Sequence, residues 1–335
     1  MDMSFEVVII GAGPAGLQAA LVLARARRRV LVLDAGQPRN AAAAHLHGFL
    51  SRDGMEPGEL LRIGREEVMA YGGQIRSGTV EAVDRLDSGS FAVTLARGER
   101  VDADTVLVAT GLRDELPAVP GIESRWGRDV LHCPYCHGYE VAEQPFAVLG
   151  GENRPFSIHQ AGLVRRWSSD VIFFPDTIVL SDEERERLSA FGVRIIDGRV
   201  NHIAVTEDRV AGVVLADGTS IPRSVVFVGP RFLPRDDMLK RLGCERADNG
   251  WVRTDATGAT TVPGVWAAGN VVDSPAQIIS AAGSAYMAAV AINHYLLAAD
   301  IDRAVAGVRR GETAFSAEME RRVCELVLGD RRHGM

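Results

Sequence analysis

The chain has 335 residues, of which 47% are hydrophobic and 24% are charged, and this balance indicates a globular protein with about two domains. A net charge of −7 argues against a nucleic-acid partner. The N-terminal residues carry no basic segment followed by an apolar run, so we expect no signal peptide and a cytoplasmic protein. No apolar stretch reaches the roughly 18 residues of a membrane span, so we expect no membrane partner.

A strand–turn–helix–strand pattern begins the chain and recurs in its middle, which predicts an α/β fold with two nucleotide-binding units. In the first unit, apolar strands at 7–10 and 30–33 enclose a helix over about 14–27. The other predicted elements are strands at 105–108, 146–149, 171–174 and 264–268, a helix from the capping box Ser181-Asp-Glu-Glu184 to Gly192, a hairpin turn at Asp217-Gly218, and a helix over about 275–299. We expect a first domain split into 1–115 and 247–335, with a second domain inserted at 116–246.

The glycine-rich turn after the first strand predicts a dinucleotide site. Gly11 permits the tight turn, Gly13 lets the backbone approach a pyrophosphate, and Gly16 packs the helix on the strand. Asp34 ends the next strand, where a carboxylate accepts from a ribose hydroxyl. The alternative is a glycine-rich turn without a ligand, and the pattern alone leaves FAD or NAD open.

Cys133 and Cys136 are separated by two residues, a spacing that closes a small strained disulfide and favours redox chemistry. The alternative is half of a zinc site, but structural zinc needs four ligands, usually from a second pair. Cys244 and Cys324 are isolated in the sequence, so we expect no metal and interpret both as small buried hydrophobic residues.

Together with these motifs, Ala109-Thr110-Gly111 and residues 265–273 look like flavin-contact segments, and most of residues 1–300 resembles the thioredoxin reductase family. The resemblance implies two Rossmann-like dinucleotide-binding domains of the three-layer ββα type, with the FAD domain split by an inserted NAD(P)-like domain, and a homodimer. The family usually has Asp where Asn270 stands. The residues implied to bind FAD are Gly11, Gly13, Pro14, Ala15, Gly16, Asp34, Ala35, Arg39, Asn40, His45, Val80, Ala109, Thr110, Gly111, Gly269, Asn270, Gln277 and Ile278.

The second nucleotide site departs from the family pattern. Glu152 stands where the second key glycine is expected, and it places a side chain where a pyrophosphate must approach. Pro155 replaces a small packing residue, and Phe174-Pro175-Asp176 replaces the basic residues that hold a 2′-phosphate. We expect a degenerate site, with a working NADH site that uses Asp176 for a ribose hydroxyl as the alternative.

In the family, the second cysteine lies against the flavin and the first meets the substrate, which maps to Cys136 and Cys133. His137 follows the pair, and the Cys-Pro-x-Cys-His motif resembles the flavin dithiol oxidases of the holomycin and gliotoxin pathways. A histidine there can accept a thiol proton near neutral pH. The alternative is that His137 only fills space.

The resemblance therefore implies an FAD-dependent oxidase that closes a disulfide in a small-molecule or protein dithiol and passes the electrons to O₂. The alternatives are a disulfide reductase fed by NAD(P)H or ferredoxin, and an FAD-binding redox sensor. His45 and His47 are candidates for a flavin or substrate role, with plain loop residues as the alternative. A short amphipathic helix is predicted over 319–329.

Overall fold

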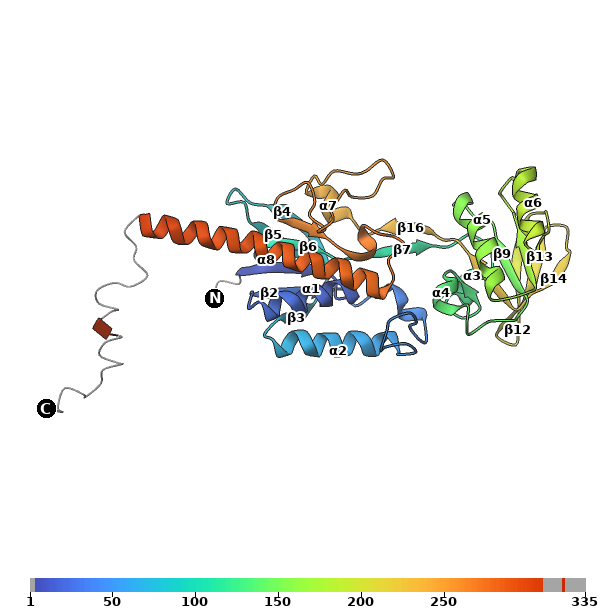
Figure 1. Ribbon diagram of the computed structural model, residues 1–335, viewed down its shortest axis with the longest axis horizontal. Coiled ribbons are helices and arrows are strands. Elements are labelled where there is room, and N and C mark those ends of the chain that lie inside the picture. Colours follow the sequence, from blue (N-terminus) through green and yellow to red (C-terminus); the bar gives the residue numbers. More distant parts are fainter. Residues whose placement is uncertain (1–3, 310–320, 323–335) are drawn as a thin grey trace.

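The computed structural model describes residues 4–309 and 321–322, which form two lobes joined by a pair of extended segments (Figure 1). These segments are β7 (Leu112–Glu115) and β16 (Arg231–Pro234), which pair in antiparallel fashion. The first lobe consists of the residues before β7 and after β16, and the inserted lobe consists of the residues between them. The helix predicted over 319–329 lies largely outside the described residues.

The first lobe is built on a mixed sheet with the order β3-β2-β1-β6-β5-β4, in which β17 also pairs with β6. The neighbours of β1 and the β6–β17 pair run parallel, whereas β4, β5 and the first half of β6 run antiparallel. The strands are β1 (Ser4–Ile10), β2 (Val30–Asp34), β3 (Gln74–Ser77), β4 (Val80–Arg85), β5 (Phe91–Leu95), β6 (Arg100–Val108) and β17 (Val265–Ala267). The strand predicted at 105–108 is the second half of β6.

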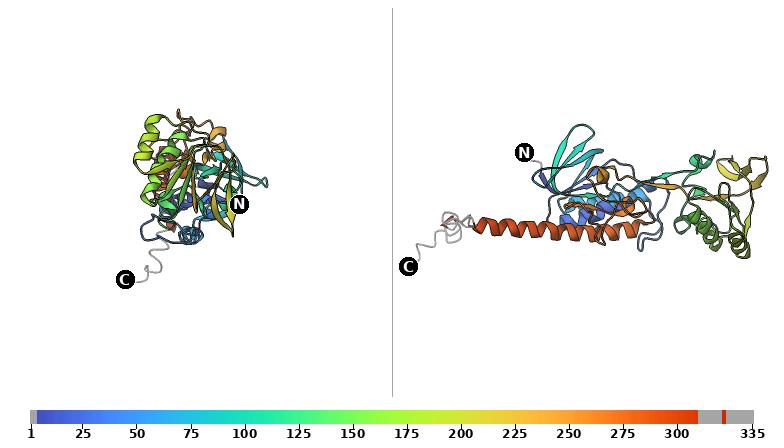
Figure 2. Two further views of the ribbon diagram at one scale, coloured as in Figure 1. Left: turned by 90° about the vertical axis from the view of Figure 1, so that its right-hand side faces the viewer. Right: turned by 90° about the horizontal axis from the view of Figure 1, so that it is seen from above.

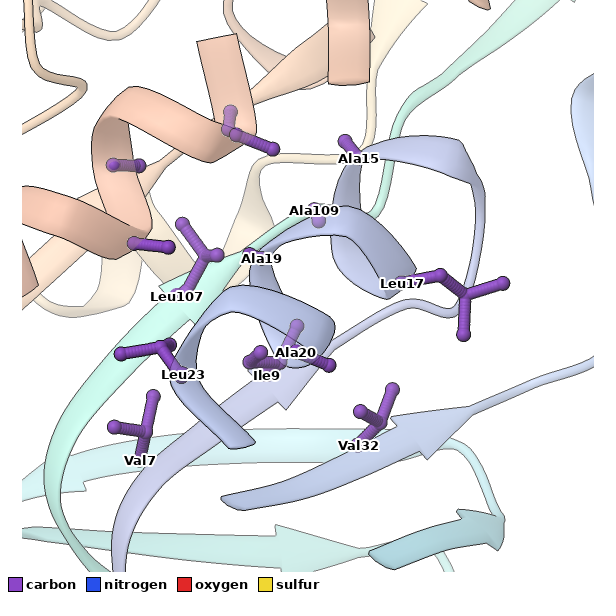
Figure 3. Packing of buried hydrophobic residues seen from close by; sticks show 14 of the residues in the cluster. Val7, Ile9, Ala15, Leu17, Ala19, Ala20, Leu23, Val32, Leu107 and Ala109 are labelled. Atoms are coloured by element: carbon purple, nitrogen blue, oxygen red, sulfur yellow. The ribbon is translucent and has the colours of Figure 1, made fainter. Parts of the chain in front are cut away.

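Alternating side chains of β1 supply the cores on the two faces of this sheet. Val7 and Ile9 pack beneath α1 and α8 together with Leu23 (Figure 3), whereas Val8 and Ile10 pack toward β5 and α7. Helices thus cover one face and an antiparallel hairpin covers the other, which confirms the predicted three-layer ββα arrangement. The helical elements of this lobe are α1 (Pro14–Arg25), η1 (Arg39–Ala42), α2 (Pro57–Ala70), α7 (Asp237–Arg241), η3 (Gly269–Val271) and α8 (Ile278–Arg309).

Two helices differ from their predicted lengths. α1 ends at Arg25 rather than at about residue 27, because Arg27 adopts a left-handed backbone with φ of +63°. α8 begins at Ile278 and continues to Arg309, ten residues beyond the predicted end, and it runs along the first lobe and past its edge (Figure 2). Ion pairs from Asp300 to Arg28 and Arg303 help to hold this extension. No helix in the described part of the chain combines the length and apolarity needed to cross a membrane.

The inserted lobe repeats the same layering. Its parallel sheet has the order β11-β10-β9-β15-β8, with α5, η2 and α6 on one face and the antiparallel sheet β12-β13-β14 on the other. Its strands are β8 (Val130–Leu131), β9 (Phe146–Leu149), β10 (Val171–Phe174), β11 (Val193–Ile195), β12 (Val200–Thr206), β13 (Arg209–Leu215), β14 (Ser220–Pro222) and β15 (Val225–Val228), and its helical elements are α3 (Ile122–Arg125), α4 (Pro134–His137), α5 (Arg154–Leu163), η2 (Val164–Arg166) and α6 (Asp182–Ala190).

Two local predictions in this lobe are confirmed. Ser181 and Glu184 form the capping box of α6, and the hairpin between β13 and β14 contains Gly218 with φ of +89°.

We still propose a first domain that is interrupted by an inserted domain, but with an earlier end for the inserted domain. The sequence prediction assigned residues up to 246 to the inserted domain. Leu239 of α7 and Cys244 are instead buried in the core of the first lobe, beside Phe91 of β5. We therefore propose that the inserted domain ends at the β7–β16 connection.

Candidate active site

A cavity of about 480 Å³ lies at the carboxyl ends of β1, β2 and β6 and extends to the redox loop of the inserted lobe. Parallel α/β sheets place ligands at this edge. The predicted residues that line it are Gly11, Gly13, Pro14, Ala15, Asp34, Ala35, Arg39, Asn40, His45, Val80, Ala109, Thr110, Gly111, Asn270, Gln277, Ile278, Cys133, Cys136 and His137. Residues from distant parts of the chain thus meet around one space.

Gly16 and Gly269 do not line the cavity, although both were predicted to bind the cofactor. A Cβ on Gly16 would lie 1.8 Å from the carbonyl oxygen of Gly11, so Gly16 serves the close packing of α1 on β1. Gly269 has φ of +74°, and its Cβ would lie 2.9 Å from the Cβ of Ala15. Both glycines therefore allow the close packing of the residues that line the cavity, without lining it themselves.

Gly13 provides the test of whether a dinucleotide fits. A Cβ on Gly13 would meet no atom of the described residues within 4 Å, although Gly13 lines the cavity directly before α1. Gly11 turns the chain there with φ of +105°. The amino end of α1 is therefore open to the cavity, which suits the pyrophosphate of FAD. Pro14 at the first helical position removes no needed N–H.

The carboxylate of Asp34 lines the cavity and is held in place by two hydrogen bonds. Its Oδ1 accepts from the backbone N–H of Ala12 at 3.2 Å, and its Oδ2 accepts from Arg65 Nη2 at 2.5 Å. Arg65 lies on α2 and also lines the cavity. The sequence prediction missed Arg65, because its partner is 31 residues away and belongs to another element.

Asn270 has a structural reason to differ from the Asp expected in the family. Its Nδ2 donates to the carbonyl oxygens of Asp273 at 2.9 Å, Ser274 at 3.2 Å and Ala276 at 3.0 Å. A carboxylate cannot donate to these oxygens, so Asn270 holds the loop that leads into α8. Its Oδ1 accepts from Arg39 Nη1 at 3.4 Å.

Arg39 joins the first lobe to the connecting strands. Its guanidinium donates to both oxygens of Asp114 on β7, at 2.8 and 2.7 Å, and its carbon lies 5.2 Å from the ring centre of Phe232 on β16. Bidentate pairs of this kind fix geometry well. Asp114 lines the cavity and was not predicted, since nothing in its local sequence indicates a site.

The redox pair occupies a single turn of helix at the other end of the cavity. Cys133 is the N-cap residue of α4 and Cys136 lies within it, and both are half-buried thiols. A hydrogen bond from Cys136, together with the backbone N–H groups of Cys136 and Tyr135, lowers the pKa of Cys133 to about 7. The same hydrogen bond and burial raise the pKa of Cys136 above its ordinary range. Cys133 is therefore the more readily charged sulfur.

His137 lines the cavity directly after Cys136. Burial lowers its pKa below 6.5, while the nearby Glu140 acts in the opposite direction and His47 again lowers it. The imidazole is therefore neutral at pH 7 and able to accept a proton. His45 and His47 also line the cavity, as expected for a flavin or substrate role, and His45 Nδ1 lies 3.1 Å from the carbonyl oxygen of Gly54.

The loop of the inserted lobe that we predicted to be degenerate is held by its own side chains. Asn153 caps α5 by accepting from the N–H of Phe156 at 3.3 Å, and Arg154 donates to Glu184 at 2.5 Å. The Glu152 carboxylate is 80% exposed at the amino end of this helix. Asp176 is only 11% exposed and accepts from the N–H of Val200 at 2.9 Å. Its carboxylate is therefore engaged within the lobe.

Two other predictions concern the isolated cysteines and a metal. Cys244 is buried, and its Sγ lies 3.5 Å from Thr260 Oγ1, whereas Cys324 lies outside the described residues. Within residues 4–309 and 321–322, no three His, Cys, Asp or Glu side chains come together in a way that could hold a metal ion.

The chain is similar to several known proteins. The family model of pyridine nucleotide-disulphide oxidoreductases matches residues 5–285. Thioredoxin reductase sirT of Leptosphaeria maculans is 31% identical over 314 residues, which cover 89% of this chain and 96% of that protein. The crystal structure of HlmI has a TM-score of 0.90 at 50% identity and covers 93% of this chain and 99% of HlmI. The putative thioredoxin reductase TrxB from Bacillus anthracis has a TM-score of 0.84 at 31% identity, with coverages of 88% and 99%.

The two lobes have the layering of dinucleotide-binding domains, and the cysteine pair faces the cavity that suits a dinucleotide. This combination defines a flavin-dependent disulfide oxidoreductase. The chain belongs to the pyridine nucleotide-disulphide oxidoreductase family and, within it, to the thioredoxin-reductase-like FAD proteins. It is an FAD-dependent enzyme that acts on a sulfur group.

Proposed function

We propose that this protein oxidises a dithiol, in a small molecule or a protein, to a disulfide and uses O₂ as the final electron acceptor. The observation that carries the proposal is the contrast between two sites. Cys133, Cys136 and His137 line the cofactor cavity together, whereas Glu152 is exposed at the amino end of α5, at the position where the family pattern predicts a glycine for the pyrophosphate of a nicotinamide nucleotide. Electrons therefore enter through the cysteine pair.

The chemistry of the pair follows from the two sulfurs. One substrate thiolate attacks Cys133 in the Cys133–Cys136 disulfide, which breaks the S–S bond and leaves the electron pair on Cys136 as a thiolate. The second substrate thiolate attacks the substrate sulfur now bound to Cys133, closes the substrate disulfide and releases Cys133 as a thiolate. We propose that His137 accepts a proton that the substrate thiols lose.

When bound in this cavity, FAD would supply a two-electron acceptor for the reduced cysteine pair and a donor to O₂, with H₂O₂ as the product. Gly11, Gly13 and the amino end of α1 would hold its pyrophosphate, and Asp34 its ribose.

Oxygen consumption provides the direct test of this proposal. The purified protein with dithiothreitol should consume O₂ and form H₂O₂ over many turnovers, and Cys133→Ser should abolish this. Fast, sustained disulfide reduction with NADPH or NADH would instead assign the reductase direction. A single stoichiometric reduction without turnover would assign a redox sensor.

We also propose that the enzyme is a cytoplasmic homodimer. Reactive cysteine pairs of this spacing suit a reducing compartment. Ile279, Tyr286 and Met287 on α8 are about half exposed, and apolar faces of this kind are commonly covered in assemblies. Light scattering should give twice the chain mass of 36.1 kDa, and Met287→Glu should shift it toward the monomer.

A further inference from the structure

Gln277 contacts both sulfurs of the redox pair, although it belongs to the other lobe. The single thiol proton of Cys136 is shared between Cys133 and Gln277 Oε1, which lies 3.2 Å from the Cys136 sulfur, and Gln277 Nε2 donates to the Cys133 sulfur at 3.6 Å. The backbone carbonyl of Gln277 accepts from the N–H of Ala281 at 2.8 Å and from Ser280 Oγ at 3.1 Å. The first turn of α8 therefore anchors this side chain against the cysteines.

The oxygen and the nitrogen of the Gln277 amide favour different protonation states of the two sulfurs. The oxygen can only accept, so it favours a protonated thiol, whereas the N–H group donates and so favours a thiolate. The observed contacts therefore suit a neutral Cys136 and a charged Cys133. The helical N–H groups of α4 act on Cys133 in the same direction.

We propose that Gln277 is a positioning residue of the redox pair, whose amide determines which of the two sulfurs carries the negative charge. A half-turn about its terminal bond exchanges Oε1 and Nε2 and hence exchanges the charged sulfur. The inference deepens the proposed function and rests on it for this step, since that reaction leaves a thiolate first on Cys136 and then on Cys133. Only a side chain with both a donor and an acceptor can serve both stages.

Gln277 is one of several groups that act on the pair, since the hydrogen bond between the two sulfurs and the backbone N–H groups of Cys136 and Tyr135 also lower the pKa of Cys133. Arg39 lowers the pKa of Cys136 through its charge, which opposes the arrangement observed. His137 is on the same helix as the cysteines and is neutral at pH 7. Variants of Gln277 leave these two side chains unchanged, and Gln277→Met, which adds no charge, isolates the contribution of the amide.

The test measures the ionisation of Cys133 directly. The holoprotein is reduced anaerobically with excess dithiol, labelled briefly with iodoacetamide between pH 5.5 and 9, and the label on Cys133 is quantified by mass spectrometry. The wild-type labelling rate should have its midpoint near pH 7. Gln277→Glu is isosteric, can only accept and adds a negative charge, and both changes should raise the midpoint, by one unit or more in total, which cuts labelling at pH 7 about fivefold.

Gln277→Met, which keeps the length and removes both hydrogen-bonding ends, should raise the midpoint in the same direction by a smaller amount. Gln74→Glu is the matched control, because Gln74 is exposed on β3 and contacts Arg76 at 3.2 Å. The proposal is overturned if both Gln277 variants keep the wild-type midpoint, or if Gln74→Glu shifts it equally. Labelling needs no electron acceptor, so this result is independent of whether the enzyme is an oxidase.

Discussion

His47 Nε2 lies 3.4 Å from Glu140 Oε1, so an imidazole of the first lobe contacts a carboxylate of the inserted lobe, three residues after His137. The other ring nitrogen of His47 lies 3.2 Å from Asp53 Oδ2, which keeps the ring in place. Glu140 acts on His137 through its charge as well. The pKa of His137 is therefore influenced by residues of both lobes.

His137→Ala should slow flavin reduction by dithiols about 10²–10⁴-fold at pH 7, the usual range for lost general-base catalysis. Burial lowers the pKa of His137, so the neutral base is present above pH 6.5 and is lost as the pH falls through that lowered value. The defect should shrink toward pH 9, where the substrate thiols ionise unaided. Anaerobic stopped-flow reduction from pH 5 to 9 gives the profile.

Glu140→Gln serves as the comparison for this prediction. Removing the carboxylate that raises the pKa of His137 should move the acid limb of the profile to lower pH while the rate at pH 8 stays near wild type. If His137 only fills space, neither variant will change the shape of the profile.

The two cysteines should behave differently when replaced. Cys133→Ser leaves Cys136 facing the flavin cavity, so a long-wavelength charge-transfer band should develop as Cys136 ionises. Cys136→Ser should abolish reduction by dithiols and show no band. Absorbance between pH 6 and 10 provides the measurement. A band in Cys136→Ser, absent from Cys133→Ser, would reverse the assignment of the two sulfurs.

NADPH and NADH should reduce the flavin at least about 100-fold more slowly than dithiothreitol, since a carboxylate facing a pyrophosphate costs several kcal/mol. The carboxylate is Glu152, which is 80% exposed at the amino end of α5. Anaerobic bleaching of the flavin band measures both rates. Glu152→Gly combined with Pro155→Ala should regain part of the nicotinamide rate, whereas fast bleaching of the wild type would refute the prediction.

Gly13→Val should yield a colourless protein that stays folded. Its Cβ would meet no atom of the described chain within 4 Å, so the apoprotein should stay folded and lose only about 1 kcal/mol of stability, because Val is a poorer N-cap residue than Gly. Gly16→Ala is the contrasting variant, because its Cβ would collide with the carbonyl oxygen of Gly11 at 1.8 Å and should destabilise the fold. Flavin absorbance and thermal unfolding separate the two effects, and full FAD content in Gly13→Val would contradict this assignment of the phosphate site.

His132 should make the protein sensitive to acid. It packs between Phe156 and Phe232, and its Nδ1 has no hydrogen-bond partner among the described residues. Burial and then the charge of Arg39 lower its pKa to about 4. The unfolded chain binds this proton already near pH 6.5, so the free energy of unfolding should fall by about 3 kcal/mol between pH 6.5 and 4.

The variant His132→Phe should remove that part of the pH dependence, as followed by the thermal midpoint at pH 7 and pH 4.5. The exposed His159 provides the control, and His159→Gln should keep the wild-type slope. An unchanged slope in His132→Phe would show that His132 is not the group responsible.

The sequence by itself determined the features that depend on neighbouring residues. Gly11, Gly13 and Gly16 predicted the phosphate turn, and the spacing of Cys133 and Cys136 predicted a redox pair, because each requirement is met within a few residues. The strand pattern likewise predicted an α/β fold with two nucleotide-binding units, and the family resemblance implied three layers in each. The role of Glu152 in the second site is still a prediction from the same kind of local comparison.

The tertiary structure decided every feature that joins distant parts of the chain. Gln277 meets Cys136 across 141 positions, and Arg39 meets Asp114 across 75. Asn270 could be interpreted as a donor to the loop before α8 only once that loop was seen. No local pattern encodes the pairs of Gln277 and Arg39, since each arises from the packing of elements that are far apart in the chain. The sequence therefore determined which chemical groups are available, and only folding determined which of them act on the same pair of sulfurs.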